Sequence, residues 1–483
     1  MNVPFVKISS FLFVFAAAAS GLAATPAIAA QQSLLPTRNS PIPADLRAAL
    51  QQNLARNAAS AASPCANLSQ PHPQTCAGKA PSPLGTLDWI NQVVTGDDLA
   101  DFAMFGAAVS VDGTTAIIGS PQYNPIGNAY GVGAAYVFTK TATGWTQTQK
   151  LVPADGVLGD NFGISVALQG DTAMVGAYNA SIDGDDKQGA IYVFRPLAGA
   201  WTQMQKLSPS DATAGRMVGA WIALDGDNAL VSTPAGMMGD DATTAPVYAL
   251  HQDGGSWSVS QTIQADDYTF GDVFGYQTAL HGNTAMIGAP GASGLEGAVY
   301  VFTLTDGVWT QGQKLSPSDT GELLAFGWAV AFDGGTALIG APYANIGDYS
   351  MQGAAYVFSL EDGSWNQMQK LTPVIGGDDV RYGLAVALSG DTAVVASAWT
   401  NQVEGITSYG GAWLYAAAGE DGFVPRSTLL SPTDEVTAFA YTAAISGGTL
   451  LFGDPIDGTT SIGLAAFYTQ DRIFKNGFDG ASP

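Results

Sequence analysis

The chain has 483 residues and a formal net charge of −24, and 47% of its residues are hydrophobic while only 12% are charged. This apolar fraction excludes an intrinsically disordered chain, and the acidic excess argues against nucleic acid because phosphates would be repelled. Three His and two Cys leave little material for a zinc or thiol site. The 59 Gly in a charge-poor chain favour short strands joined by tight turns.

Residues 1–30 have the features of a secretory signal peptide. Lys7 precedes an apolar run at residues 11–24, and Ala27-Ile28-Ala29-Ala30 provides the small residues that signal peptidase cuts. The alternative is a retained membrane anchor, although the run is short for a bilayer. We therefore expect an exported mature chain that is secreted or held in the cell envelope.

Residues 31–86 are predicted to be a Pro- and Ala-rich leader without a core of its own. Residues 44–62 contain helix-forming Ala, Leu, Gln and Arg between prolines, which predicts a short helix. Because export leads to an oxidising compartment, Cys65 and Cys76 are expected to form a disulfide. Two free thiols are the alternative.

A repeat with a period near 56 residues fills most of the remaining chain. Its tryptophans are Trp89, Trp145, Trp201, Trp257, Trp309 and Trp365. Phe-Gly pairs and Tyr-Val-Phe runs keep the same order in each unit. In the second unit, strands are expected at residues 164–168, 172–177, 190–194 and 201–207, with Gly or Asp at the connections. A four-stranded meander at this spacing predicts a β-propeller blade.

Seven units can be counted, and the two ends of the repeat complement each other. The seventh unit begins at Phe439 and lacks a fourth strand, whereas residues 88–94 provide a strand in register with the fourth strands. We therefore predict an all-β fold, a seven-bladed β-propeller of four-stranded antiparallel blades at residues 87–468. The N-terminal strand is expected to close the ring and so remove an exposed sheet edge.

The Phe-Gly starts, together with Gly-Ala-Pro at residues 288–290 and 340–342, resemble the FG-GAP repeat. That repeat builds the seven-bladed propeller of integrin α subunits and of many exported bacterial proteins. The resemblance implies a binding or adhesion platform, often with Ca²⁺ in its blades. Family blades hold Ca²⁺ between strands one and two, where this chain has only tight turns such as Asp225-Gly226-Asp227. Ca²⁺ is therefore not expected at those turns.

Acidic residues are divided unevenly between the two faces of the predicted ring. Inter-blade connections and strand 2–3 loops meet at one face, and most acids of residues 87–468 fall there. One interpretation is that Asp forms turns. The other is that some clusters bind Ca²⁺, because close carboxylates gain from a shared cation. The candidate calcium ligands are Asp183, Asp185, Asp186, Asp266, Asp267 and Asp272.

No catalytic constellation is recognisable in the sequence. His72, His251 and His281 lack partner groups at catalytic spacing, and no nucleophile elbow, zinc-protease helix or phosphate loop occurs in a matching context. The repeated Trp and Tyr are interpreted as blade-packing residues rather than a sugar-stacking track. The recurring lysines of the fourth strands are expected to be exposed at the rim: Lys150, Lys206, Lys314 and Lys370.

Residues 469–483 form a tail outside the predicted ring. Its segment from Ile473 to Phe478 is similar to a short ending on exported proteins of some Gram-negative bacteria, and the alternative is an apolar strand on the propeller edge. The sequence as a whole predicts an exported, non-enzymatic binding or adhesion module. Its protein or glycan partner is expected on the face of inter-blade and strand 2–3 loops. The alternatives are a propeller enzyme acting on polysaccharide and a structural envelope protein without a dedicated ligand.

Overall fold

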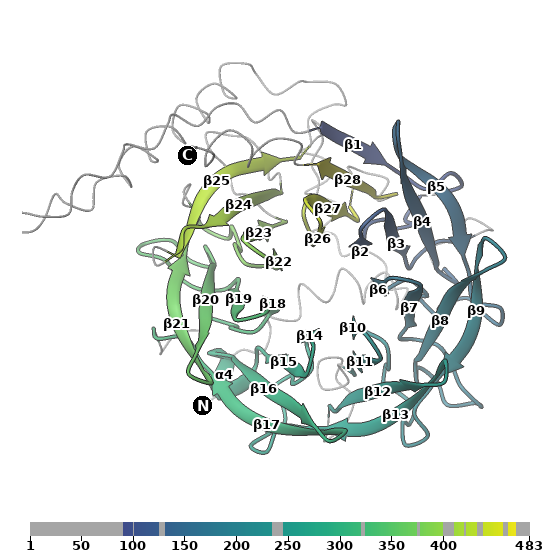
Figure 1. The fold of residues 1–483 in the computed structure, drawn as a ribbon, viewed down its shortest axis with the longest axis horizontal. Coiled ribbons are helices and arrows are strands. Elements are labelled where there is room, and N and C mark those ends of the chain that lie inside the picture. Colours follow the sequence, from purple (N-terminus) through teal and green to yellow (C-terminus); the bar gives the residue numbers. More distant parts are fainter. Residues whose placement is uncertain are drawn as a thin grey trace, which may run out of the picture.

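The structure is a computed structural model that describes residues 90–99, 101–124, 131–233, 245–319, 324–373, 377–398, 410–419, 422–431, 438–456 and 462–469. The predicted signal peptide, the leader with Cys65 and Cys76, and residues 470–483 of the tail lie outside the described residues. The described strands form seven four-stranded antiparallel sheets arranged as a ring (Figure 1). This arrangement confirms the predicted all-β, seven-bladed propeller.

Each blade places its first strand at the ring centre and its fourth strand at the rim (Figure 1). Blade 1 is β2 (Ala108–Asp112), β3 (Thr115–Ser120), β4 (Ala134–Thr141) and β5 (Gly144–Leu151). Blade 2 is β6 (Ser165–Gln169), β7 (Thr172–Ala177), β8 (Ala190–Leu197) and β9 (Ala200–Leu207). Blade 3 is β10 (Ile222–Asp225), β11 (Asn228–Val231), β12 (Val247–Asp253) and β13 (Ser256–Ile263).

The remaining blades follow the same order along the chain. Blade 4 is β14 (Thr278–His281), β15 (Thr284–Ala289), β16 (Ala298–Thr305) and β17 (Val308–Leu315), with the short helix α4 (Ala292–Leu295) between β15 and β16. Blade 5 is β18 (Ala329–Asp333), β19 (Thr336–Ala341), β20 (Ala354–Glu361) and β21 (Ser364–Leu371). Blade 6 is β22 (Ala385–Ser389), β23 (Thr392–Ser397), β24 (Gly411–Ala417) and β25 (Phe423–Leu430). Blade 7 is β26 (Thr442–Ser446), β27 (Thr449–Asp454), β28 (Leu464–Thr469) and β1 (Ile90–Val94).

The outer strand of blade 7 comes from the N-terminal side of the propeller. β1 pairs antiparallel with β28, with Gln92 opposite Phe467, and Figure 1 shows the two strands side by side. The indole of Trp145 in blade 1 stacks on the Phe467 ring at a centroid distance of 4.3 Å. Segments far apart in the sequence therefore meet in one sheet, and an aromatic contact joins that sheet to the first blade.

The Phe-Gly marker lies where one blade meets the next. Phe162 is fully buried and packs edge-to-face on Tyr192 at 5.3 Å. Gly163 has a φ of 92°, and a Cβ there would lie 2.2 Å from the Ala134 carbonyl oxygen of the preceding blade. A Cβ on Gly119, from the Gly-Ala-Pro position of that blade, would lie 2.0 Å from the Gly163 oxygen. The two markers recur because the backbones of neighbouring blades touch at these glycines.

A belt of glutamine side chains joins the outer strands of neighbouring blades. The Gln149 amide donates to the Trp201 carbonyl at 2.6 Å and accepts from the Trp201 amide at 2.7 Å. The same double contact links five further pairs: Gln92 and Trp145, Gln205 and Trp257, Gln261 and Trp309, Gln313 and Trp365, and Gln369 and Phe423. The side-chain amide of each glutamine thus makes the same pair of hydrogen bonds that a backbone amide makes between two strands. The repeated Trp side chains at 145, 257, 309 and 365 are buried, as predicted for packing residues.

Candidate functional site

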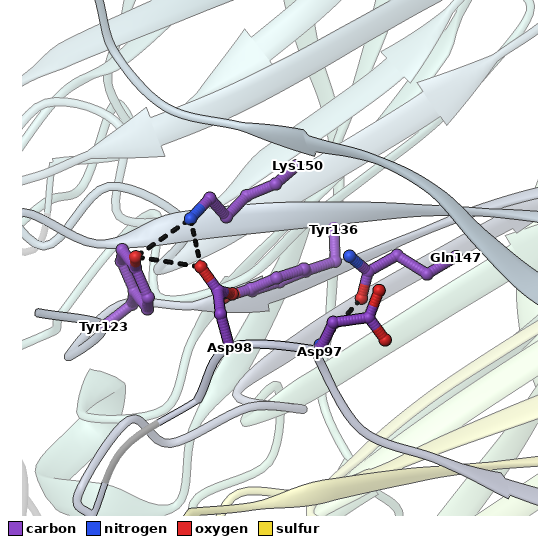
Figure 2. A network of polar contacts seen from close by, with 6 residues as sticks. All are labelled: Asp97, Asp98, Tyr123, Tyr136, Gln147 and Lys150. Carbon is purple, nitrogen blue, oxygen red and sulfur yellow. Dashed lines mark hydrogen bonds and ion pairs between the residues drawn. The ribbon is translucent and has the colours of Figure 1, made fainter. Parts of the chain in front are cut away.

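A network of tyrosine, aspartate and lysine recurs at the blade junctions. In blade 1, Asp98 accepts hydrogen bonds from the hydroxyls of Tyr136 at 2.9 Å and Tyr123 at 3.0 Å and forms an ion pair with Lys150 (Figure 2). Lys150 Nζ also donates to the Tyr123 hydroxyl at 2.9 Å. Burial raises the pKa of the Asp98 carboxyl, but the hydrogen bonds from Lys150, Tyr136 and Tyr123 lower it by more. The pKa therefore lies below its usual value.

Three other junctions repeat this network with the same residue types. The equivalent sets are Asp155, Tyr192 and Lys206; Asp267, Tyr300 and Lys314; and Asp319, Tyr356 and Lys370. Side chains of the four lysines are between 27% and 32% exposed. As whole residues, Lys314 is exposed, as expected, whereas Lys150, Lys206 and Lys370 are partly buried. Each of the four lysines is paired with an Asp from the preceding inter-blade connection, so the network fastens that connection to the blade that follows it.

The candidate calcium ligands lie in two separate loops of the same face. Asp183, Asp185 and Asp186 are exposed in the loop between β7 and β8. The other three lie between β13 and β14, where Asp267 binds Lys314 and Asp272 accepts from the Thr269 amide at 2.8 Å. Asp266 is exposed. Within the described residues, no group of three or more His, Cys, Asp or Glu is placed to hold a metal ion. Calcium binding at these six residues stays a prediction.

The two histidines within the described residues are exposed and lie near strand 1–2 and 3–4 turns. The His251 Nδ1 atom is 3.0 Å from the Asn228 side-chain oxygen, and His281 Nδ1 is 3.6 Å from Asp333 Oδ1. Both lie on the face opposite the inter-blade connections. His72 is outside the described residues.

A cavity of about 290 Å³ lies on the propeller axis. Residues of all seven blades line it, and all of them except Tyr178, which follows β7, lie around the start of an inner strand. It therefore lies toward the face where inter-blade connections enter the inner strands. Its aromatic members are Trp221, Tyr276, Trp328, Tyr441 and Tyr178, while blades 1, 2 and 6 contribute mainly Ala, Val, Ile and Leu.

The aromatic side chains form one continuous wall across blades 3, 4 and 5. The ring centroids of Trp221 and Tyr276 are 4.8 Å apart, and those of Tyr276 and Trp328 are 4.4 Å apart. Tyr343, which follows β19, continues the wall with an edge-to-face contact on Trp328 at 5.4 Å. Tyr276 and Trp328 are buried, whereas Trp221 and Tyr441 are only partly buried. The cavity is thus aromatic on one side and aliphatic on the other.

The described residues that line the cavity include none with a charged side chain. Three of its polar side chains bind neighbouring blades: Ser165 donates to the Gly219 carbonyl, Thr442 donates to the Gly106 carbonyl, and the Gln277 side-chain oxygen accepts from the Val330 amide. Burial raises the pKa of Tyr276 far above its usual value, and the nearby Tyr441 and Tyr343 raise it further. Burial likewise raises the pKa of Tyr178 to about 12. The described lining of the cavity is therefore uncharged at neutral pH.

A cation of the chain itself lies beside the aromatic wall. The guanidinium carbon of Arg381 is 5.6 Å from the Tyr343 ring centroid, and Arg381 Nε donates to Asp379 Oδ1 at 2.6 Å. The Arg381 side chain is only 13% exposed. The Tyr343 ring is therefore already in contact with a cation that Asp379 neutralises.

Sequence reasoning missed this cavity, although the sequence contains a signal for it. The residue directly after each Phe-Gly or equivalent pair faces the axis, and it varies while its neighbours repeat. In blade order these residues are Ala107, Ile164, Ala220, Tyr276, Trp328, Leu384 and Tyr441. A position that varies within an otherwise strict repeat is free of the packing contacts that fix its neighbours, so its side chain can serve a ligand site instead.

Comparisons with known proteins bear on the fold and on the family. Within the described residues, no helix is long and apolar enough to cross a membrane. The chain is similar to a solved structure, the periplasmic gluconolactonase of Pseudomonas aeruginosa, with 14% identity and a TM-score of 0.43 over 67% of this chain and 88% of that one. A search of curated proteins gives no match. The FG-GAP repeat family matches more than half of the chain, at residues 91–138, 145–194, 201–248, 257–302, 309–358 and 365–415. The chain therefore belongs to the FG-GAP repeat family.

Proposed function

We propose that this FG-GAP propeller is an exported, non-enzymatic binding module whose ligand enters the axial cavity. The observation that carries the proposal is the cavity itself, an uncharged space with an aromatic wall and a few hydroxyl and amide groups. Concave apolar sites with few polar groups are the usual form of ligand sites in proteins. Export rests on the signal-peptide pattern of residues 1–30.

Binding accounts for this lining better than catalysis does. General acid–base catalysis needs a group whose pKa lies near the working pH. The titratable side chains among the lining residues are tyrosines, and burial raises the pKa of Tyr276, Tyr441 and Tyr178. These hydroxyls stay protonated near neutral pH, where they can donate and accept hydrogen bonds but cannot act as bases.

A neutral fluorescent probe tests whether the cavity takes a ligand. N-phenyl-1-naphthylamine should bind the mature chain saturably with one site, and Trp221→Ala should weaken the binding about tenfold or more. Trp201→Ala is the matched control, because Trp201 is also partly buried but lies in the outer strand β9. Binding that is absent, or equally weakened in both variants, would contradict the proposal.

The non-enzymatic part of the proposal has its own test. Polysaccharides incubated with the mature chain should be recovered unchanged, with no new reducing ends. Release of products that is lost in a cavity variant would instead support the alternative of a propeller enzyme.

A further inference from the structure

Resting on the proposed function, we infer that the axial cavity binds one uncharged sugar ring, such as the terminal hexose of a glycan. Four properties of the cavity lead to this ligand: its volume, its aromatic wall, its hydroxyl groups and its lack of charge. Each is compatible with several ligands, but a neutral sugar satisfies all four together.

The volume limits the ligand to about one ring. The cavity of about 290 Å³ lies just below the range for ligand pockets, about 300–1,000 Å³. It is also bounded by the inner strands on all sides, because every blade contributes to its lining. An extended chain therefore has no groove to follow, and only its end can enter.

The aromatic wall offers a platform for an apolar ring face. The face of an aromatic ring carries negative charge density and attracts positively polarised C–H groups, which a pyranose presents on the side without hydroxyls. Trp221 and Tyr441 are the lining aromatics that remain partly exposed. Trp221 packs against Tyr276 at 4.8 Å, so its orientation is supported by the wall behind it.

Three tyrosines line the cavity: Tyr178, Tyr276 and Tyr441. Tyr178 and Tyr276 are buried, and Tyr441 is partly buried. A protonated phenol both donates and accepts hydrogen bonds. Sugar hydroxyls do the same, so uncharged tyrosines can form hydrogen bonds with an uncharged sugar.

The lack of charge selects against ionised ligands. A carboxylate or ammonium group transferred into this lining would find no described counter-ion among the lining residues, and an unpaired buried charge is strongly disfavoured. Arg381, which lies against the Tyr343 ring, is paired with Asp379. Uronic acids and free amino sugars should therefore bind poorly.

Isothermal titration calorimetry with six compounds tests the inference. The probes are neutral methyl hexosides (methyl glucoside, galactoside and mannoside), N-acetylglucosamine, glucuronate, and cyclohexylmethanol as an apolar ring of similar size. At least one neutral sugar should bind with Kd of about 1 mM or tighter, and glucuronate should bind at least about tenfold more weakly than it. Tyr441→Phe keeps the ring and removes one hydroxyl, so it should weaken the sugar about two- to tenfold and affect cyclohexylmethanol, which has a single hydroxyl, less than the sugar.

The outcomes separate this inference from the proposed function. If cyclohexylmethanol binds and none of the neutral sugars does, the sugar inference is wrong. The proposed function as a binding module with a ligand in the cavity would then stand, and the result would favour an apolar side chain of a protein partner as the ligand. Glucuronate that binds as tightly as glucoside would overturn the charge argument and with it the inference. If neither the sugars nor cyclohexylmethanol bind, both the inference and the cavity site are wrong. Trp201→Ala and the thermal transition of each variant control for loss of folding.

Discussion

Replacing Gln205 with Met should weaken the junction between blades 2 and 3 while keeping the size of the side chain. The Gln205 amide donates to the Trp257 carbonyl at 2.7 Å and accepts from the Trp257 amide at 3.0 Å. Methionine can make neither bond, and each hydrogen bond contributes about 0.5–1.5 kcal/mol. The expected loss in free energy of unfolding is therefore about 1–3 kcal/mol. The lower half of this range applies if water reaches the partly buried backbone groups of Trp257.

Urea unfolding followed by tryptophan fluorescence measures this loss as a shift in the midpoint at constant slope. Met204→Ala is the control, because Met204 is the adjacent residue of β9 and its side chain is 54% exposed. That variant should stay within about 0.5 kcal/mol of the parent. A Gln205→Met variant as stable as the Met204→Ala variant would refute the view that the glutamine belt holds the outer strands together.

Other expected outcomes test the junctions and the loops. Gly163→Ala should destabilise the fold by about 3 kcal/mol or more, because the new Cβ meets the Ala134 oxygen. Gly170 also has a positive φ but lies in open space, so Gly170→Ala should destabilise the fold by only about 1 kcal/mol. Equal losses in urea unfolding would contradict the argument that the backbones of neighbouring blades touch at Gly163. The pKa of Asp155 is lowered from 3.8 in the folded chain, since hydrogen bonds from Lys206 and Tyr192 outweigh burial. The unfolded chain then binds more protons at acid pH. The contribution of Asp155 to the free energy of unfolding is therefore present above about pH 4 and is lost as the pH falls through the pKa of Asp155 in the folded chain. Asp155→Asn should flatten this acid dependence of Tm, and an unchanged profile would count against the network. If the candidate aspartates bind Ca²⁺, a chelator should lower Tm, and an unchanged transition would remove the metal hypothesis.

The sequence predicted the propeller because its markers correspond to contacts that every blade must make. Phe162 is buried at a junction and Gly163 touches the preceding backbone, so each unit repeats the pair. The ion pairs of the fourth-strand lysines were not predicted, because their partners lie far away in the sequence. Lys150 looks like an exposed strand residue until its partner is known, and Asp98 lies 52 residues earlier, in the connection that precedes the blade. Contacts between repeats at such separations are not visible in the pattern of one unit.

The axial cavity was beyond sequence reasoning because it consists of single residues from seven distant segments. The scaffold has approximate sevenfold symmetry, yet Tyr276 and Trp328 lie on one side of the axis and Ala107 and Ile164 on another. A lining with true sevenfold symmetry would offer a ligand seven equivalent orientations. The aromatic wall removes that equivalence, so a ring stacked on Trp221 has a defined orientation relative to the Tyr441 hydroxyl. The departure from the repeat, rather than the repeat itself, is therefore what makes a specific site on this axis physically feasible.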